Sequence, residues 1–460
     1  MALKASTIWS ELKIGDEAAL TRLCLADDFY VFAHASGNLN PMNLPHYDED
    51  GDGRSDAVAP SMWLASLISA VLGNLLPGPG TLYRSQNLRF LGRAHAGEQL
   101  RIGVRLIEKL PDNIARFETW VEVEGGARLV EGEAEVIAPA VKREFDLEEI
   151  PGLLVQRHMH FDKLLAKAET LAPLPVAVVA PEEAQALAGA LLAAKHNLIQ
   201  PILIGRVDKM RAAAREIGAD LGAFEILGVE SSDGAAREGV ALYHQGRVRA
   251  LMKGHLHTDE LLHHVVKKEG GLRTGRRLSH VFVMDVPGLD HLLLVTDAAI
   301  NIAPDLEEKV DIVQNAIDLA LALGIELPKV GVLSAVETVN PKIPSTLDAA
   351  ILSKMAERGQ IRGGVVDGPL AMDNAMDVEA AKTKGVKSLV AGRADILVAP
   401  NLEAGNILAK ELTFTSHAEC GGVVLGAQCP IILTSRADDE KARLASCAVA
   451  ALYADWKSRA

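Results

Sequence analysis

A short polar segment near the C-terminus carries the clearest chemical signal in the sequence. Ser435, Arg436, Asp438 and Asp439 place a hydroxyl, a guanidinium and two carboxylates close together, after the apolar run Pro430–Thr434 and before a helical stretch. The start of a helix attracts anions because its free N–H groups and its dipole are positive. The segment therefore indicates an anion site. Ordinary helix capping uses the same residue types and is the alternative interpretation.

A second concentration of positive charge lies at residues 267–277, with the sequence KKEGGLRTGRR. It holds five basic residues and one acidic residue in a chain of net charge −14. Guanidinium groups bind phosphate well, and Gly270, Gly271 and Gly275 would let the backbone approach a ligand. The segment predicts a cradle for phosphate groups, with a solvated helix end and turn as the alternative.

Metal and nucleotide motifs are weak or absent. Asp48, Asp50, Asp52 and Gly53 have the pattern that opens a calcium loop, but Ala59 stands where that loop needs a bidentate glutamate, which favours a solvated acidic turn. No G-x-G-x-x-G, G-x-x-x-x-G-K-[ST] or G-x-S-x-G motif occurs. Four histidines lie close together without the H-E-x-x-H pattern of a zinc site, namely His255, His257, His263 and His264. The sequence therefore predicts no metal.

The elements that must position these residues change in character between residues 138 and 154. Before this point, the segments from Thr81 to Pro139 alternate apolar and polar residues, which predicts an antiparallel sheet with one wet face. An apolar helix from Ser61 to about Leu76 precedes them and ends at Pro77-Gly78-Pro79-Gly80. A sheet wrapped around one helix is the expected fold of this part.

Beyond about residue 155, short apolar runs alternate with helical stretches. Strands of this kind are buried on both faces and mainly parallel, and ligands bind in the crevice at their carboxyl ends. The runs are Pro175–Ala180, Pro201–Gly205, Val281–Val286, His291–Thr296, Lys329–Ser334, Asp395–Ala399 and Pro430–Thr434. Loops are expected at Thr296-Asp297, Ser334-Ala335, Asp367-Gly368-Pro369, Pro400-Asn401 and Thr434-Ser435-Arg436.

Composition narrows the class of protein. The 460 residues are 49% apolar and 23% charged, which is typical of folded globular proteins. An excess of acidic residues argues against a general nucleic-acid or polybasic membrane binder. No apolar run approaches a membrane span, and the N-terminus has no apolar signal core. Four cysteines without a C-x-x-C pair indicate small buried residues in a reducing cytoplasm: Cys24, Cys420, Cys429 and Cys447.

Six stretches of the chain beyond about residue 155 form an ordered set of motifs. They are LMKGHLHTDELL (251–262), TDAAINIAPDLEEKVDIVQNA (296–316), VLSAVETVNPKIPSTLDAA (332–350), VDGPLAMDNA (366–375), PNLEAGNILAKEL (400–412) and LTSRAD (433–438). With these motifs, residues 155 to 460 resemble the phosphate acetyl/butyryltransferase family. The resemblance implies an open α/β fold of two subdomains, like that of the isocitrate dehydrogenases, with the site in the cleft between them. It also implies exchange of an acyl group between coenzyme A and phosphate.

Residues 1–150 resemble a MaoC-type hotdog domain, the fold of the (R)-specific enoyl-CoA hydratases. The matching runs are 32–44 (FAHASGNLNPMNL) and 61–100. Asn38 and Asn43 stand where those hydratases carry Asp and His. A neutral amide cannot act as general acid or base, and His34 and His46 do not hold the motif positions. The expected role is acyl-CoA binding or dimerisation without hydration.

The family resemblance implies roles for individual residues. Asp438 is the favoured base for the thiol proton, with Asp439 as the alternative. Ser435 would hydrogen-bond the thiol, and Arg436 would bind the phosphoryl group. The candidates for contacts to coenzyme A or phosphate are Arg273, Arg277, Lys253, Thr258, Asn401, Gly405 and Asn406.

The whole chain is similar to bifunctional enoyl-CoA hydratase/phosphate acetyltransferases. Coenzyme A, its acyl thioester and phosphate are the expected substrates of a cytoplasmic homo-oligomer, with no tightly bound cofactor, nucleic acid or membrane. Acetyl is favoured over butyryl. Three alternatives remain: a non-catalytic sensor of coenzyme A or phosphate, a true bifunctional hydratase, and an NAD-dependent decarboxylating dehydrogenase. The intact S-R-x-D segment argues against a non-catalytic sensor. The two asparagines argue against a true hydratase. The missing metal and nucleotide motifs argue against the dehydrogenase.

Overall fold

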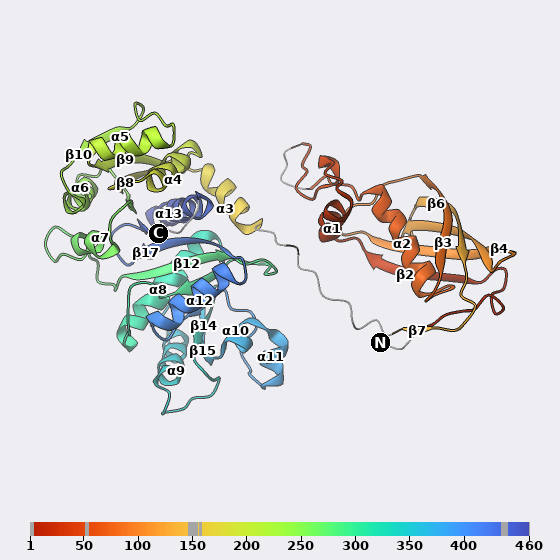
Figure 1. The fold of residues 1–460 in the computed structure, drawn as a ribbon. Coiled ribbons are helices and arrows are strands. Elements are labelled where there is room, and N and C mark those ends of the chain that lie inside the picture. The colour runs from red at the N-terminus through yellow and green to blue at the C-terminus, as the bar shows by residue number, and fades with distance from the viewer. Residues whose placement is uncertain (1–3, 51–54, 146–154, 156–158, 434–439, 460) are drawn as a thin grey trace. The chain divides into compact units, whose positions relative to one another are not determined.

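The computed structural model describes residues 4–50, 55–145, 155, 159–433 and 440–459 (Figure 1). The chain divides into two compact units, Met1–Val155 and Gln156–Ala460. Among the described helices, none has the length and apolar character needed to cross a membrane.

The N-terminal unit is a five-stranded antiparallel sheet packed against one long helix. The helix α2 (Ser61–Asn74) buries Leu64, Ile68 and Leu72, which share one face because they are spaced four residues apart. This face packs on the sheet, as the sequence predicts. The strand order is β2 (Glu17–Leu23), β4 (Gln99–Leu110), β5 (Ile114–Val123), β6 (Arg128–Ile137) and β3 (Leu82–Phe90). The remaining elements are β1 (Lys4–Ala5), β7 (Glu144–Phe145), α1 (Ala26–Ser36) and the 3-10 helix at Pro41–Asn43.

The C-terminal unit is built on an eleven-stranded, mainly parallel sheet, which confirms the predicted fold class. One parallel group is β10 (Glu225–Gly228), β9 (Ile199–Gly205), β8 (Leu174–Val179), β11 (Ala250–Lys253) and β18 (Ile431–Ile432). The other is β13 (Leu293–Thr296), β16 (Ile396–Val398), β14 (Lys329–Leu333) and β15 (Val365–Leu370). Antiparallel β17 (Glu419–Leu425) and β12 (Ser279–Asp285) join them, so the two groups run in opposite directions.

Helices cover this sheet, and α13 (Glu440–Arg459) is the most deeply buried of them. It is buried from Ala442 to Ala454 and packs on β17, α3 and α4 (Figure 1). The others are α3 (Met159–Glu169), α4 (Ala184–Lys195), α5 (Val207–Glu216), α6 (Ser232–His244), α7 (Thr258–Val265), α8 (Leu306–Leu323), α9 (Pro344–Glu357), α10 (Met372–Met376), α11 (Val378–Thr383) and α12 (Leu402–Phe414).

One predicted loop is wrong. Asp367-Gly368-Pro369 lies inside β15 and does not follow a strand. Gly and Pro usually mark turns, but β15 is the last strand of the sheet, and an edge strand tolerates Pro because one side of it has no ladder partner. Each of the seven predicted apolar runs does contain a strand.

The shortness of β18 determines where its carboxyl end lies. Only Ile431 and Ile432 belong to β18, and Leu433 N then donates to Gly422 O on β17. Gly422 in turn pairs with Phe282 near the middle of β12. The end of β18 therefore lies beside the middle of β17 and β12, and not beside the ends of these strands.

Candidate active site

Lys253 and Leu433 occupy equivalent places at the ends of neighbouring parallel strands. Met252 pairs with Ile432, so Lys253 and Leu433 are the next residues along β11 and β18. The Lys253 side chain is buried, and its Nζ donates to Gly254 O at 3.5 Å and to Leu256 O at 3.4 Å. Lys253 thus lies next to Leu433 in the sheet, with its buried ammonium held by the carbonyls of Gly254 and Leu256.

The predicted catalytic residues follow directly in the chain. Ser435, Arg436, Asp438 and the alternative Asp439 lie outside the described residues, so their assignment rests on the sequence. The described chain ends at Leu433, two residues before Ser435, so the structure gives the position from which this segment starts.

The backbone after β11 is fixed against the backbone after β8. Gly254 N donates to Val179 O at 2.8 Å, and His255 N donates to Ala180 O at 2.7 Å. The His255 imidazole Nε2 lies 2.7 Å from Glu183 Oε1. Thr258, a predicted substrate contact, is half-buried and begins α7 on the same connection.

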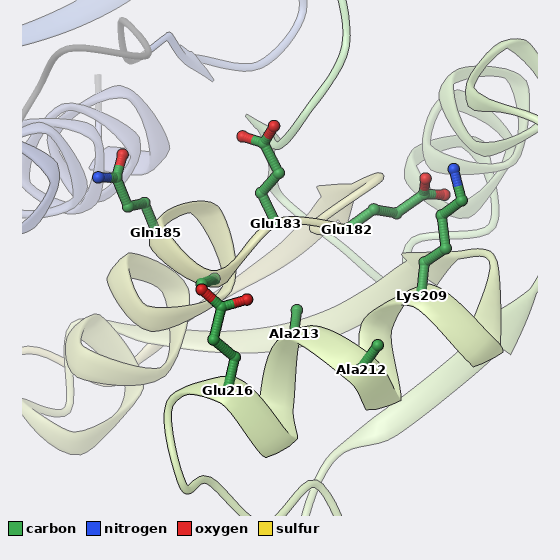
Figure 2. A pocket seen from close by; sticks show the side chains of 8 residues that line it. Glu182, Glu183, Gln185, Lys209, Ala212, Ala213 and Glu216 are labelled. Carbon is green, nitrogen blue, oxygen red and sulfur yellow. The ribbon is translucent and has the colours of Figure 1, made fainter.

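A pocket of about 400 Å³ lies between the start of α4 and α5 (Figure 2). Its buried wall is Glu182, whose carboxylate accepts hydrogen bonds from Arg206 N and Nε, each at 2.9 Å. Burial acts to raise the pKa of Glu182, but the Arg206 hydrogen bonds and charge hold it below the ordinary value. Glu183 and Glu216 add acidic groups and Lys209 adds one base. Anionic substrates would be disfavoured here, and none of the predicted site residues that the structure describes lines the pocket.

A second polar group surrounds the loop after β13. The Asp297 carboxylate is buried and accepts hydrogen bonds from the backbone N–H groups of Ala299, Ile300 and Asn301 at 2.9, 3.1 and 3.1 Å. It also accepts from Asn301 Nδ2 at 2.5 Å. These donors compensate the buried charge and fix the shape of the loop.

Arg277 is attached to this loop. Its Nε donates to Asn301 Oδ1 at 2.8 Å, and its Nη1 lies 3.0 Å from Glu308 Oε1. Its backbone N donates to Asp311 Oδ2 at 2.8 Å. The side chain remains about half exposed, so the guanidinium is oriented by the protein and still faces solvent.

Three predicted residues lie at the start of α12, where they either contact the same loop or cap the helix. Asn401 is the N-cap, and its side chain accepts from Ala404 N at 2.9 Å. Asn406 Nδ2 donates to Ala298 O at 3.1 Å. Gly405 allows close packing, because a Cβ there would lie 2.4 Å from Asp297 O. The structure therefore brings Arg277, Gly405 and Asn406 together around one loop and gives Asn401 a capping role.

Arg273 lies apart from this group. It forms an isolated bridge with Ala427, and its carbonyl accepts from Gln428 Nε2 at 3.2 Å. The side chain is exposed, and within the described part of the chain no ion pair forms with it. Its predicted phosphate contact remains a prediction.

The possible metal motifs do not form a buried cage. In the described residues, one acidic group converges: Asp48, Asp50 and Asp56 have oxygens within 4.8 Å of one another, and all three are exposed. Asp52 and Gly53 lie outside the described residues. His255 pairs with Glu183, whereas His264 is buried against Asp233 at 2.7 Å. Exposed acidic groups often carry no ion, and we assign none.

In the N-terminal unit, the two asparagines at the hydratase positions lie side by side. Asn38 Nδ2 donates to Asn43 Oδ1 at 3.4 Å, and Asn43 Nδ2 donates to Val58 O at 2.9 Å. His46 Nδ1 lies 3.5 Å from the Tyr30 hydroxyl, and His34 is exposed near the end of α1. The amides meet each other, and neither histidine is bonded to them.

The three buried cysteines do not provide an activated nucleophile. Burial raises the pKa of the Cys24, Cys429 and Cys447 thiols to about 12. These three thiols remain protonated at neutral pH, when they are poor nucleophiles. Cys420 is partly buried.

Sequence reasoning did not identify Asp297 and Asn301, whose side chains fix the loop after β13. The two had a recognisable signal, because an Asp after an apolar strand with an Asn four residues later can bind the backbone of its own turn.

Comparison with known proteins identifies the family of the C-terminal part of the chain. The family model described as phosphate acetyl/butaryl transferase matches residues 232–451. Phosphate acetyltransferase of Rhizobium meliloti is 60% identical over 294 residues, which are 64% of this chain and 93% of the relative. Phosphate butyryltransferase of Clostridium acetobutylicum is 45% identical over 297 residues, which are 65% of this chain and 99% of the relative.

Two solved structures are also similar to this chain. A branched-chain phosphotransacylase from Enterococcus faecalis V583 covers 61% of this chain and 99% of its own, with 31% identity and a TM-score of 0.54. The (R)-hydratase PhaJ1 from Pseudomonas aeruginosa covers 34% of this chain and 99% of its own, with 34% identity and a TM-score of 0.32.

Proposed function

The chain belongs to the phosphate acetyl/butyryltransferase family, and from that membership we propose that it exchanges a short acyl group between coenzyme A and phosphate. The observation that carries the proposal is the 60% identity to a phosphate acetyltransferase across 93% of that relative's length. A match over 294 residues extends far beyond any single motif.

The reaction needs no covalent enzyme intermediate. A phosphate oxygen attacks the thioester carbonyl, a C–O bond forms, the C–S bond breaks, and coenzyme A leaves as a thiolate that takes up a proton. In reverse, the thiol must lose its proton before it attacks the acyl phosphate. Binding both substrates together supplies much of the rate enhancement, because it removes the entropy cost of their encounter.

We assign the proton transfer to Asp438, the thiol hydrogen bond to Ser435 and the phosphoryl group to Arg436. Lys253, the last residue of β11 and the neighbour of Leu433, adds a second cation near the end of β18. Arg277, oriented by Asn301 and Glu308, is the candidate for the phosphates of coenzyme A. Arginine and lysine supply the positive charge in this mechanism, so we propose no resident metal or cofactor.

The acyl group is proposed to be acetyl, with butyryl as the second candidate. The 60% identity is to an acetyltransferase and the 45% identity is to a butyryltransferase. Release of free thiol from acetyl-, propionyl- and butyryl-CoA, measured with and without phosphate, tests both the activity and the chain length. Release that does not depend on phosphate, or no release from any of the three, would contradict the proposal.

For the N-terminal unit we propose acyl-CoA binding without hydration. Hydration needs one group to take a proton from water and another to donate one, and the paired amides of Asn38 and Asn43 can do neither. Equilibrium binding of crotonyl-CoA, with hydration followed in parallel, tests this proposal. The predicted homo-oligomer stays a prediction, and the mass of the protein in solution measures it.

A further inference from the structure

The helix α8 turns one polar face towards Arg277. Glu308, Asp311 and Asn315 are spaced three and four residues apart, which places their side chains on the same face of the helix. All three bond to Arg277. Much of the rest of α8 is buried in the core of the C-terminal unit, so these side chains project from a firmly packed helix.

Two of these side chains hold the backbone of Arg277. Asp311 Oδ2 accepts from Arg277 N at 2.8 Å, and Asn315 Nδ2 donates to Arg277 O at 3.0 Å. Asn315 is fully buried, and its Nδ2 also donates to Ser279 Oγ at 2.9 Å, at the start of β12. The Arg277 carbonyl is enclosed further by Gly426, where an added Cβ would lie 2.2 Å from it. The peptide groups on both sides of the Arg277 Cα therefore have little freedom to move.

The Arg277 side chain is held at one edge and open at the other. Its Nε donates to Asn301 Oδ1 at 2.8 Å, and its Nη1 lies 3.0 Å from Glu308 Oε1. Glu308 is itself fixed, because its Oε2 accepts from Asp305 N at 3.1 Å in the capping box of α8. Nη2 forms no hydrogen bond with the described residues, and 52% of the side chain is exposed. Nη2 therefore presents its two N–H donors to solvent in a fixed direction.

We propose that Asp311 and Asn315 are positioning residues for the binding of coenzyme A, because they fix the backbone from which the Arg277 guanidinium reaches a phosphate group of this ligand. The proposal rests on the proposed function and on Arg277 as the residue that contacts the phosphates of coenzyme A. A guanidinium binds phosphate through hydrogen bonds of fixed direction, so its affinity depends on where its Cα is held. Asn301 and Glu308 set the rotation of the side chain, whereas Asp311 and Asn315 set the position of its base.

Two substitutions of Asp311 separate the hydrogen bond from the rest of the side chain. Asp311→Asn keeps an oxygen that can accept from Arg277 N, whereas Asp311→Ala removes the acceptor. We expect the KM for acetyl-CoA to rise about three- to tenfold in the Ala variant and to stay near the wild-type value in the Asn variant. The value of kcat should not change, because Arg277 is assigned to the nucleotide end of the substrate and not to the reacting atoms. Asn315→Ala should raise the same KM, because it releases the Arg277 carbonyl.

Acetyl-pantetheine distinguishes phosphate binding from a general loosening of the structure. This thioester has the reacting end of acetyl-CoA without the nucleotide and its phosphates, so its KM should be the same in the wild type and in all three variants. Gln314→Ala is the matched control, because Gln314 on α8 holds the backbone N–H and carbonyl of Arg362 in the same way, at 2.9 and 3.0 Å. This control should lower stability in urea and leave both KM values unchanged.

An unchanged KM for acetyl-CoA in Asp311→Ala, or an equal rise in Asp311→Asn, would overturn the proposal. A rise for acetyl-pantetheine as large as that for acetyl-CoA would overturn it too, because the loss would then not concern the phosphates. Calorimetric titration with free coenzyme A separates these failures from a failure of the proposed function. If the unaltered protein shows no phosphate-dependent thiol release, the acyl exchange fails, and weaker coenzyme A binding in Asp311→Ala than in Asp311→Asn alone decides whether α8 positions Arg277 for this ligand.

Discussion

Replacing Asn301 with alanine tests whether the loop after β13 orients the guanidinium of Arg277. The Asn301 side chain is buried and makes three hydrogen bonds: to Asp297 Oδ2 at 2.5 Å, to Leu278 O at 2.8 Å and from Arg277 Nε at 2.8 Å. Two of these bonds involve a charged partner. Asn301→Ala removes all three and leaves the partners in place.

The expected cost follows from those contacts. A hydrogen bond to a charged group contributes roughly 1.5–3 kcal/mol and a neutral one about 1 kcal/mol. Asp297 keeps its three backbone donors and Arg277 keeps Glu308, so the loss should be smaller than the sum of the three bonds. We expect the free energy of unfolding to fall by about 3 kcal/mol. The KM for acyl-CoA should rise on the order of tenfold, because Arg277 loses the group that fixes its Nε.

The control is Asn374→Ala. Asn374, on α10, is also fully buried, and its side-chain Nδ2 donates to Glu337 Oε2 at 3.2 Å. Urea unfolding of both full-length variants measures the stability, and thiol release measures KM and kcat. An Asn301→Ala variant no less stable than the control, or with an unchanged KM, would refute the role assigned to the loop.

Three further predictions concern the phosphoryl group, the N-terminal unit and pH. Arg436→Lys should lose on the order of 2–4 kcal/mol of transition-state stabilisation in kcat/KM, because a point charge cannot replace a bidentate guanidinium; near-wild-type turnover would contradict this. Crotonyl-CoA hydration by the unaltered protein should stay at background, because Asn38 and Asn43 carry no proton-transfer group; measurable hydration would mean that another residue does. The pKa of His280 is lowered from 6.5 to about 4, beside Asp297, so the unfolded state binds a proton first as the pH falls. Stability should therefore decrease from pH 6.5 towards pH 4 by up to about 1.4 kcal/mol per pH unit, and His280→Phe should lack this component in urea titrations.

The class of fold could be predicted from the sequence because hydrophobic periodicity reports burial. Period-two alternation gave the N-terminal sheet, and short apolar runs gave strands of the large sheet. The turn expected at Asp367-Gly368-Pro369 failed because the same residues suit an edge strand, and strand order is not visible in local sequence. The direction of the strands was equally hidden, since β12 and β17 have the same apolar texture as their parallel neighbours.

The candidate site could also be predicted only where its signal lies within a local stretch of sequence. Arg277, Gly405 and Asn406 could be named from sequence because each lies in a recognisable segment. Their common contact with residues 297–302 could not be predicted. Asn401 lies in a motif and was predicted to contact substrate, but its side chain caps α12 by accepting a hydrogen bond from Ala404 N. A motif reports that a residue matters without saying whether it binds a ligand or holds the backbone that does.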